Sequence, residues 1–154
     1  MIRIRTGPIV ALGLAGALSL PAGGCSSQGG SRGAEPERVV VQHVLVSFTG
    51  KLPGRVIQRS EDEARQLASE ILQRAEKGED FDALVKEYTD DSYPGLYRMA
   101  NHGEVPQSDD EYRREDMVPG FGDVAFALAP DGVGMCEFDA MDSPFGFHVI
   151  KRKQ

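Results

Sequence analysis

The hydrophobic positions of this chain alternate between strand-like and helix-like spacing and predict a series of short elements. Residues 39–48 (VVVQHVLVSF) are apolar and β-branched, which is typical of a strand. Ser60 and Glu63 form a capping box at the start of a predicted helix, which Gly78 ends. Asp80 caps a second predicted helix, whose apolar residues recur on one face: Phe81, Leu84, Val85 and Tyr88.

The second half of the chain continues with short elements and one long polar loop. Residues 96–100 predict a short strand, and residues 102–116 predict a polar, acidic loop. Residues 119–128 predict a short helix, and two further strands are expected at 135–141 and 147–153. This order of elements indicates an α+β domain in which helices cover a small antiparallel sheet.

The first residues of the chain have the three-part pattern of a secretory signal peptide. Arg3 and Arg5 give a positive start, and a 12-residue apolar stretch follows at 9–20. This stretch is short for a membrane span, which needs roughly 20 apolar residues. We therefore expect residues 1–24 to be a signal peptide.

Cys25 follows small residues at the end of the apolar stretch (AGGCSS). This arrangement resembles the lipobox of bacterial lipoproteins, in which the cysteine thiol is acylated. The best lipoboxes have Leu three residues before the cysteine, where this chain has Ala22, so the alternative is an ordinary cleaved signal and a secreted or periplasmic protein. Residues 25–36 predict a flexible tether. Ser26 in place of Asp favours the outer membrane, with the domain facing the periplasm.

Composition and charge exclude several classes of function. The formal net charge of −7 argues against nucleic-acid binding, which needs a net basic surface. Hydrophobic residues at 40% and charged residues at 27% fit a globular domain rather than a membrane bundle. The two cysteines, Cys25 and Cys136, exclude a disulfide scaffold, and no closely spaced pair of Cys or His predicts a zinc site.

Four separated motifs in the mature part of the chain point to one family. They are QHVLV, GEDFDALVKEYTDD, PGFGDVAFAL and SPFGFHVIKR, in that order. Together they resemble the parvulin-type (PpiC-like) peptidyl-prolyl cis-trans isomerases, and the resemblance covers residues 37–154. It implies a parvulin/FKBP-like fold, with a four-stranded antiparallel sheet, about four surrounding helices and an open groove for an extended Xaa-Pro segment.

The resemblance also implies a set of catalytic residues. His43 and His148 match the paired histidines on neighbouring central strands, and Asp91 falls where the family has an Asp or a Cys that faces the substrate amide. Ser143 matches a Ser or Thr that forms a hydrogen bond into the histidine network. The alternatives are a purely structural pair for the histidines and an ordinary turn residue for Asp91.

The same resemblance implies a pocket for the proline ring. Met117 and Phe121 match the walls of this pocket, and Phe126 is expected to pack close by. Many relatives have a Gly-Gly-Asp-Leu-Gly stretch at the middle strand, where this chain has PGLYRMANHGE. Tyr97 and Met99 are therefore the nearest candidates for the pocket residue that this stretch supplies.

The chemistry of such an enzyme needs neither a metal nor a cofactor. An Xaa-Pro bond isomerises over a barrier of about 18–20 kcal/mol without any bond being broken. The resemblance implies a foldase for Xaa-Pro bonds of unfolded or partly folded exported polypeptides, held at the cell-envelope membrane by a lipid on Cys25. The alternative is a non-catalytic chaperone or binding module for unfolded or extended segments.

Overall fold

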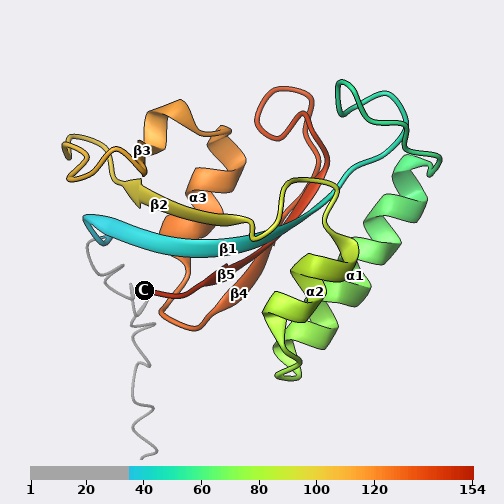
Figure 1. The fold of residues 1–154 in the computed structure, drawn as a ribbon, viewed down its shortest axis with the longest axis horizontal. Coiled ribbons are helices and arrows are strands. Elements are labelled where there is room, and N and C mark those ends of the chain that lie inside the picture. The colour runs from blue at the N-terminus through green and yellow to red at the C-terminus, as the bar shows by residue number, and fades with distance from the viewer. Residues whose placement is uncertain (1–34) are drawn as a thin grey trace, which may run out of the picture. The chain divides into compact units, whose positions relative to one another are not determined.

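The computed structural model describes residues 35–154, and these form a sheet of five strands with three α-helices and one 3-10 turn (Figure 1). The predicted signal peptide, the lipid attachment at Cys25 and the predicted tether up to residue 34 lie outside the described residues. In chain order the elements are β1 (Arg38–Val46), α1 (Glu61–Glu76), α2 (Phe81–Tyr88), β2 (Leu96–Ala100), β3 (Glu111–Arg113), η1 (Arg114–Asp116), α3 (Pro119–Ala127), β4 (Val133–Cys136) and β5 (Phe147–Arg152). Within this part of the chain, no helix is both long and apolar enough to span a bilayer.

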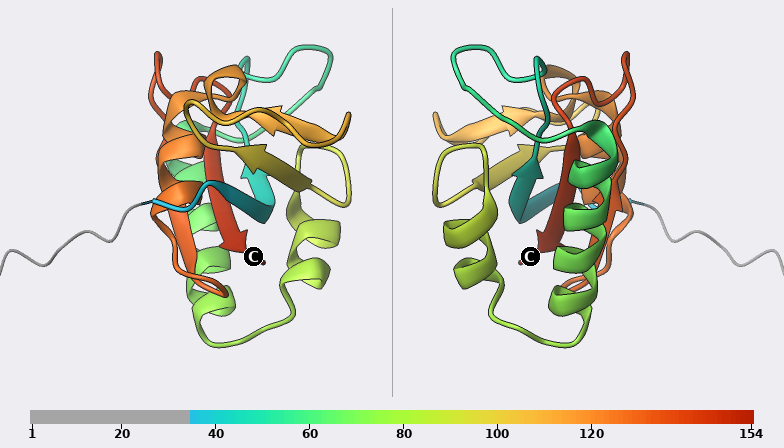
Figure 2. Two further views of the ribbon diagram at one scale, coloured as in Figure 1. Left: turned by 90° about the vertical axis from the view of Figure 1, so that its left-hand side faces the viewer. Right: turned by 90° about the vertical axis from the view of Figure 1, so that its right-hand side faces the viewer.

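The sheet has the strand order β3-β2-β1-β5-β4, so the first strand lies at its centre. β1 is antiparallel to both of its neighbours, and Figure 2 shows β1 and β5 side by side with opposite directions. In this register Leu45 lies opposite His148, and His43 lies opposite Ile150. The two predicted catalytic histidines therefore come from adjacent central strands.

Alternation along β1 gives the sheet two separate hydrophobic cores. Val44 and Val46 pack with α1 and α2, whereas Val39 and Val41 pack with α3 on the other side. In Figure 1, α1 and α2 lie towards the right and α3 towards the left. His43 has the same parity as Val39 and Val41, so its side chain emerges on the face that α3 partly covers.

The predicted helix starts are confirmed by their hydrogen bonds. The Ser60 hydroxyl accepts from the Glu63 N–H at 3.2 Å, and the Glu63 carboxylate accepts from the Ser60 N–H at 2.7 Å. The Asp80 side chain accepts from the Asp82 N–H at 3.1 Å at the start of α2. These bonds satisfy N–H groups that the first turn of a helix leaves free.

The α+β class and the parvulin-like arrangement are confirmed, but the predicted antiparallel four-stranded sheet differs in detail. β3 lies inside the predicted loop 102–116, and it runs parallel to β2 at the edge of the sheet. Ion pairs hold it there, because Glu111 lies 3.4 Å from Arg38 and Asp110 lies 3.2 Å from Arg98. Instead of about four helices, residues 35–154 contain three α-helices and the single turn η1.

The strand predicted at 135–141 begins and ends earlier in the structure. β4 is Val133–Cys136, and the chain turns soon after it because the Asp139 carboxylate accepts from the N–H groups of Met141 and Asp142. These bonds, at 2.7 and 2.9 Å, close an Asx-type turn that competes with strand pairing.

Candidate active site

Two buried histidines form the centre of the candidate site. The Nδ1 atoms of His43 and His148 lie 3.2 Å apart, and the two rings are nearly parallel, with an interplanar angle of 13°. Both side chains are buried between β1, β5 and α3, and the ring of Phe121 meets each of them edge-on at 5.2 and 5.4 Å. The aromatic ring therefore closes the histidine pair from the helix side.

Asp91 binds the other nitrogen of His43. Its Oδ2 atom lies 3.1 Å from His43 Nε2 and accepts a second hydrogen bond from the Tyr97 hydroxyl at 3.0 Å. The hydrogen bond from His43 is the main reason that the pKa of Asp91 lies well below its ordinary value. Burial and the neighbouring Asp91 charge raise the pKa of Tyr97 to about 12. Asp91 is thus an ionised acceptor, and Tyr97 is a neutral donor.

The ionised Asp91 determines where the ring protons lie between the two histidines. His43 places its proton on Nε2, towards the carboxylate, so its Nδ1 accepts the bond from His148 Nδ1–H. Burial, and secondarily the charge of His43, lower the pKa of His148 to about 3, so His148 is neutral at ordinary pH. Its Nε2 keeps a lone pair, and within residues 35–154 this atom has no hydrogen-bond partner.

The segment after α2 carries Asp91 because its neighbours bind back to β1. The Thr89 hydroxyl accepts from the Leu45 N–H at 3.2 Å, and the Asp90 carboxylate accepts from the Ser47 N–H at 2.8 Å. Asp90 also forms an ion pair with Arg59. Residues 89–91 (TDD) are therefore bound to β1 at the centre of the sheet, and this places the Asp91 carboxylate against His43.

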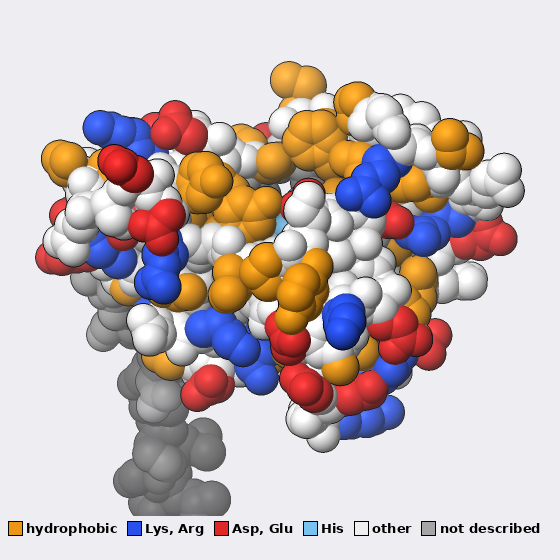
Figure 3. Space-filling view, in the orientation of Figure 1, with side chains coloured by type: hydrophobic (Ala, Val, Ile, Leu, Met, Phe, Trp, Pro, Cys, Tyr) orange, Lys and Arg blue, Asp and Glu red, His pale blue; other side chains and the backbone are white. Residues whose placement is uncertain are grey.

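A cavity of 220 Å³ opens over these groups. Its lining combines a polar floor with apolar walls from four separate segments: His43, Leu45, Leu52, Asp91, Tyr97, Met117, Val118, Phe121, Phe145 and His148. Figure 3 shows this face of the molecule, on which hydrophobic side chains gather around a central hollow. The cavity can hold a small apolar ring beside one carboxylate, without any strong nucleophile directed into it.

The PPIC-type PPIASE domain matches this chain over residues 29–154. The chain belongs to the PpiC-type peptidyl-prolyl isomerases. It is 33% identical to the Chaperone SurA of Pseudomonas fluorescens over 115 residues, and 36% identical to the Chaperone SurA of Chromohalobacter salexigens over 121 residues. These matches cover 75% and 76% of this chain but 22% and 23% of the relatives, so the chain spans less than a quarter of their length.

Two further comparisons extend the likeness. The Foldase protein PrsA of Halalkalibacterium halodurans is 34% identical over 88 residues, covering 57% of this chain and 23% of that protein. The solution structure of TbPIN1 superposes with a TM-score of 0.56 at 18% identity, covering 77% of this chain and 98% of TbPIN1. At this identity the superposition shows the shared fold alone, and it agrees with the parvulin-type assignment.

The cavity of the candidate site brings together most of the residues predicted for the pocket. Met117 and Phe121 line it, and so does Tyr97, whose hydroxyl donates to Asp91 and whose ring centre lies 5.7 Å from that of Phe121. Met99 points to the same face of β2, but it lies opposite Val39, farther along the sheet, and is buried in the core. Of the two candidates on this strand, Tyr97 lines the cavity.

Two other predicted site residues lie elsewhere. Phe126 packs against the guanidinium of Arg114, whose carbon lies 4.7 Å from the ring centre, and it does not line the cavity. The Ser143 hydroxyl donates to the Gly146 carbonyl at 3.0 Å instead of bonding to a histidine. Ser143 therefore shapes the turn before β5, and any influence it has on His148 passes through that turn.

Four cavity residues were missed in the sequence: Leu45, Leu52, Val118 and Phe145. Leu45 could have been found, because it lies two residues after His43 on the same face of a strand. Leu52 and Phe145 come from loops without periodic pattern. The loop of Phe145 is fixed by the buried Ser47 hydroxyl, which donates to the Phe145 carbonyl oxygen.

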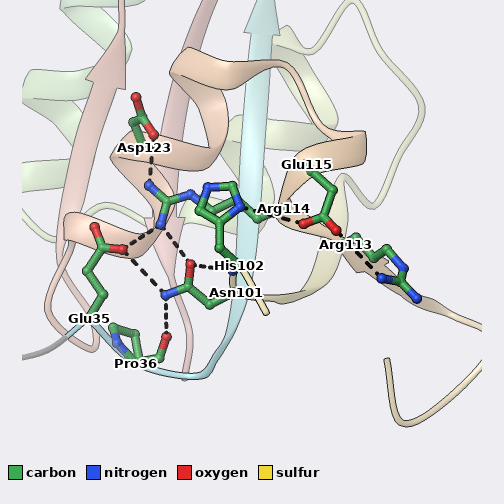
Figure 4. Close-up of polar contacts among 8 residues, drawn as sticks. All are labelled: Glu35, Pro36, Asn101, His102, Arg113, Arg114, Glu115 and Asp123. Atoms are coloured by element: carbon green, nitrogen blue, oxygen red, sulfur yellow. Dashed lines mark hydrogen bonds and ion pairs between the residues drawn. The ribbon is translucent and has the colours of Figure 1, made fainter. Parts of the chain in front are cut away.

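An ion cluster surrounds Arg114, three residues before Met117 in the chain (Figure 4). Arg114 in η1 is 8% exposed, and its guanidinium donates to Glu35, Asn101 and Asp123. The Arg114 carbonyl accepts from the Met117 N–H at 3.1 Å. The cluster thus joins the start of the described chain, the end of β2 and α3 to the turn that carries Met117. Among the described residues, no group of three or more His, Cys, Asp or Glu side chains is placed to hold a metal ion.

Proposed function

We propose that this isomerase accelerates cis-trans exchange of Xaa-Pro bonds in unfolded or partly folded exported polypeptides at the cell envelope. The observation that carries the proposal is the contact between an apolar cavity and a single ionised carboxylate, formed by Met117, Phe121 and Asp91. Met117 and Phe121 bind the proline ring, and Asp91 faces the amide that precedes it. His43 and Tyr97 hold the carboxylate in position.

The mechanism needs only a preference for the twisted amide. A planar amide carries partial negative charge on its oxygen, and twisting about the C–N bond reduces this charge. An apolar cavity withholds water from the planar form, and the Asp91 carboxylate disfavours negative charge on a nearby oxygen. A thousandfold acceleration requires about 4 kcal/mol of such preference, which a shaped pocket with one charged group can supply.

The histidine pair acts in this proposal as a support rather than as a nucleophile. His43 donates to Asp91 from one side and accepts from His148 on the other. This chain of hydrogen bonds orients the carboxylate and excludes its protonation. Because amide twisting breaks no bond, no covalent step is required.

Support for a polypeptide substrate comes from the relatives. Two of them are chaperones by name and one is a foldase, and this chain matches a segment of each. Assignment to the cell envelope rests on the sequence pattern of the first residues, with a signal peptide at 1–24, lipid on Cys25 and a tether at 25–36. The second candidate, a chaperone or binding module without catalysis, is favoured by the name of the first relatives.

A refolding experiment separates the two candidates. We expect the full chain to accelerate the slow phase of a test protein whose refolding is limited by a cis-proline, at substoichiometric concentration. A chaperone without catalysis would instead suppress aggregation of proline-free and proline-containing clients equally, leaving the slow phase unchanged. That second result would contradict the proposed activity.

A labelling experiment tests the proposed location. We expect radioactive palmitate to label the chain in cells and the labelled protein to sediment with outer membranes. A Cys25→Ala variant should lose both the label and the sedimentation. Unchanged sedimentation of Cys25→Ala would overturn the lipid anchor and leave the cleaved-signal alternative.

A further inference from the structure

A second, shallower hollow adjoins the cavity of the candidate active site. It has a volume of 180 Å³ and is lined by residues 92–97 and Tyr112. Three large apolar side chains in it are about half exposed: Tyr93 at 54%, Leu96 at 50% and Tyr112 at 49%. We call these three residues the aromatic shelf. Such a concentration of exposed apolar side chains beside a site is typical of a binding surface.

The aromatic shelf adjoins the active-site cavity at Tyr97, which lines both hollows. The Tyr97 ring centre lies 5.2 Å from that of His43 and 5.7 Å from that of Tyr112. An extended chain advances about 3.3 Å per residue, so a bound polypeptide passes from the cavity to the shelf within about three residues.

The exposed ring of Tyr93 is held in place by a chain of hydrogen bonds that begins in the sheet. Its hydroxyl donates to Asp82 Oδ2 at 2.9 Å, and Asp82 Oδ1 accepts from Gln42 Nε2 at 2.8 Å. Gln42 is buried in β1 and also donates to the Pro94 carbonyl at 3.0 Å. A ring that is fixed before binding loses little conformational freedom on contact with a ligand, which favours affinity.

We propose that the aromatic shelf is a specificity subsite that binds one large apolar side chain of the substrate within about three residues of the isomerised proline. The inference rests on the proposed function, because it assigns a preference to the same site. The occupant is aromatic or leucine-like, since the shelf offers ring faces and an aliphatic side chain. The carboxylates of Asp82 and Asp91 border the shelf and disfavour an acidic side chain there.

The experiment uses the full chain and a set of alanine-based hexapeptides with one central proline. Phe, Leu, Ala or Glu is placed singly at each of the three positions before and after that proline. For every peptide, exchange NMR gives the catalysed isomerisation rate, and a titration followed by chemical shifts gives the Kd. The uncatalysed rate of each peptide is measured in parallel, because the flanking residue alters it.

We expect Phe at one position to improve kcat/KM and Kd about tenfold over Ala, with Leu intermediate and Glu below Ala; tenfold corresponds to about 1.4 kcal/mol. Leu96→Ala and Tyr112→Ala should each remove most of this gain and leave the all-alanine peptide within about twofold of the unsubstituted protein. Tyr93→Phe, which keeps the ring and loses the bond to Asp82, should lose part of it. Val105→Ala, at an exposed residue outside both hollows, is the matched control and should keep the full gain.

Two readouts keep this inference separate from the proposed function. If no peptide isomerises faster but Phe still tightens binding and Tyr112→Ala abolishes that preference, the shelf stands and the catalytic proposal fails. If peptides isomerise faster but Phe, Leu and Ala give equal Kd and kcat/KM at every position, the shelf is overturned and catalysis stands. A Phe preference that persists in both Leu96→Ala and Tyr112→Ala also overturns the shelf.

Discussion

The Nδ1 atoms of His43 and His148 face each other at 3.2 Å, so one ring must donate and the other accept. Asp91 decides which ring donates. Its ionised carboxylate accepts a hydrogen bond from His43 Nε2–H, so the Nδ1 atom of His43 is left as an acceptor. His148 therefore donates to His43, and His43 donates to Asp91, which is the final acceptor. A pair of this kind depends on His148 being neutral, and several consequences can be measured.

The stability of the fold should fall as the pH is lowered below about 6.5. Burial depresses the pKa of His148 from 6.5 to about 3, so between these values the unfolded chain binds a proton that the folded chain does not. The stabilising contribution is therefore fully present above pH 6.5 and is lost as the pH falls towards 3, at a slope close to 1 kcal/mol per pH unit. Urea unfolding at pH 7, 6 and 5 measures it.

The variant His148→Gln isolates this effect. It removes the titrating group and should flatten the pH dependence between 7 and 5 by about 1 kcal/mol per unit relative to the unsubstituted protein. His102→Gln, at an exposed histidine in the loop before β3, is the control and should leave the slope unchanged. Equal slopes in His148→Gln and the unsubstituted protein would show that His148 titrates normally in the fold.

Asp91→Asn should slow isomerisation by about ten- to a hundredfold and should also lower the free energy of unfolding at neutral pH, because the folded chain stabilises the ionised carboxylate. The amide keeps the shape of the side chain but loses the charge, and charge-assisted hydrogen bonds contribute about 1.5–3 kcal/mol. It also removes the reason for His43 to carry its proton on Nε2. Long-range ¹⁵N–¹H spectra of the histidine rings report the tautomers directly. An unchanged His43 tautomer together with an unchanged rate would refute the role assigned to Asp91.

Tyr97→Phe should have a smaller effect on the isomerisation rate than Asp91→Asn. It removes the weaker, neutral donor to Asp91 and keeps the ring that lines the cavity. We expect a loss of about threefold to tenfold in rate, from a hydrogen bond of about 1 kcal/mol. A larger loss in Tyr97→Phe than in Asp91→Asn would reverse the proposed order of importance.

Arg114→Met should lower the free energy of unfolding by about 1–3 kcal/mol and raise the KM for peptides. The guanidinium is buried, whereas its partners Glu35 and Asp123 are partly exposed and can be rehydrated, which limits the loss. The KM rises because Met117 loses the support of η1. The matched control is Arg113→Met, at a neighbour that is 47% exposed with one ion pair of 3.6 Å. It should stay within about 0.5 kcal/mol of the unsubstituted protein.

Local signals made much of the fold predictable from the sequence. The capping box at Ser60, the Asp80 cap and the β-branched run of β1 each act within a few residues, and the structure has each of them. β3 was not predictable in this way. Two of its three residues, Glu111 and Arg113, are charged, and its place beside β2 depends on ion pairs with Arg38 and Arg98, which lie on other strands.

The candidate site was also predictable from the sequence only in part. The residues on β1 and β5 follow from strand alternation, and the resemblance of four motifs to one family placed Asp91 and Met117 beside them. Phe126 packs in the same core cluster as Phe121 but does not line the cavity, because at about 100° per residue it lies about 140° around the helix from Phe121. Its ring therefore turns from the cavity towards Arg114. Sequence proximity to a pocket residue does not place a helical side chain in the pocket.

The most direct test of the central claim is exchange NMR on Ala-Xaa-Pro-Phe peptides with the full chain, compared with Met117→Ala and Met141→Ala. Met117 lines the cavity, whereas Met141 is exposed outside it. We predict accelerated cis-trans exchange that falls about tenfold or more in Met117→Ala and is unchanged in Met141→Ala. Chemical-shift changes at the cavity residues without any acceleration would contradict the account and identify a binding module on an isomerase fold.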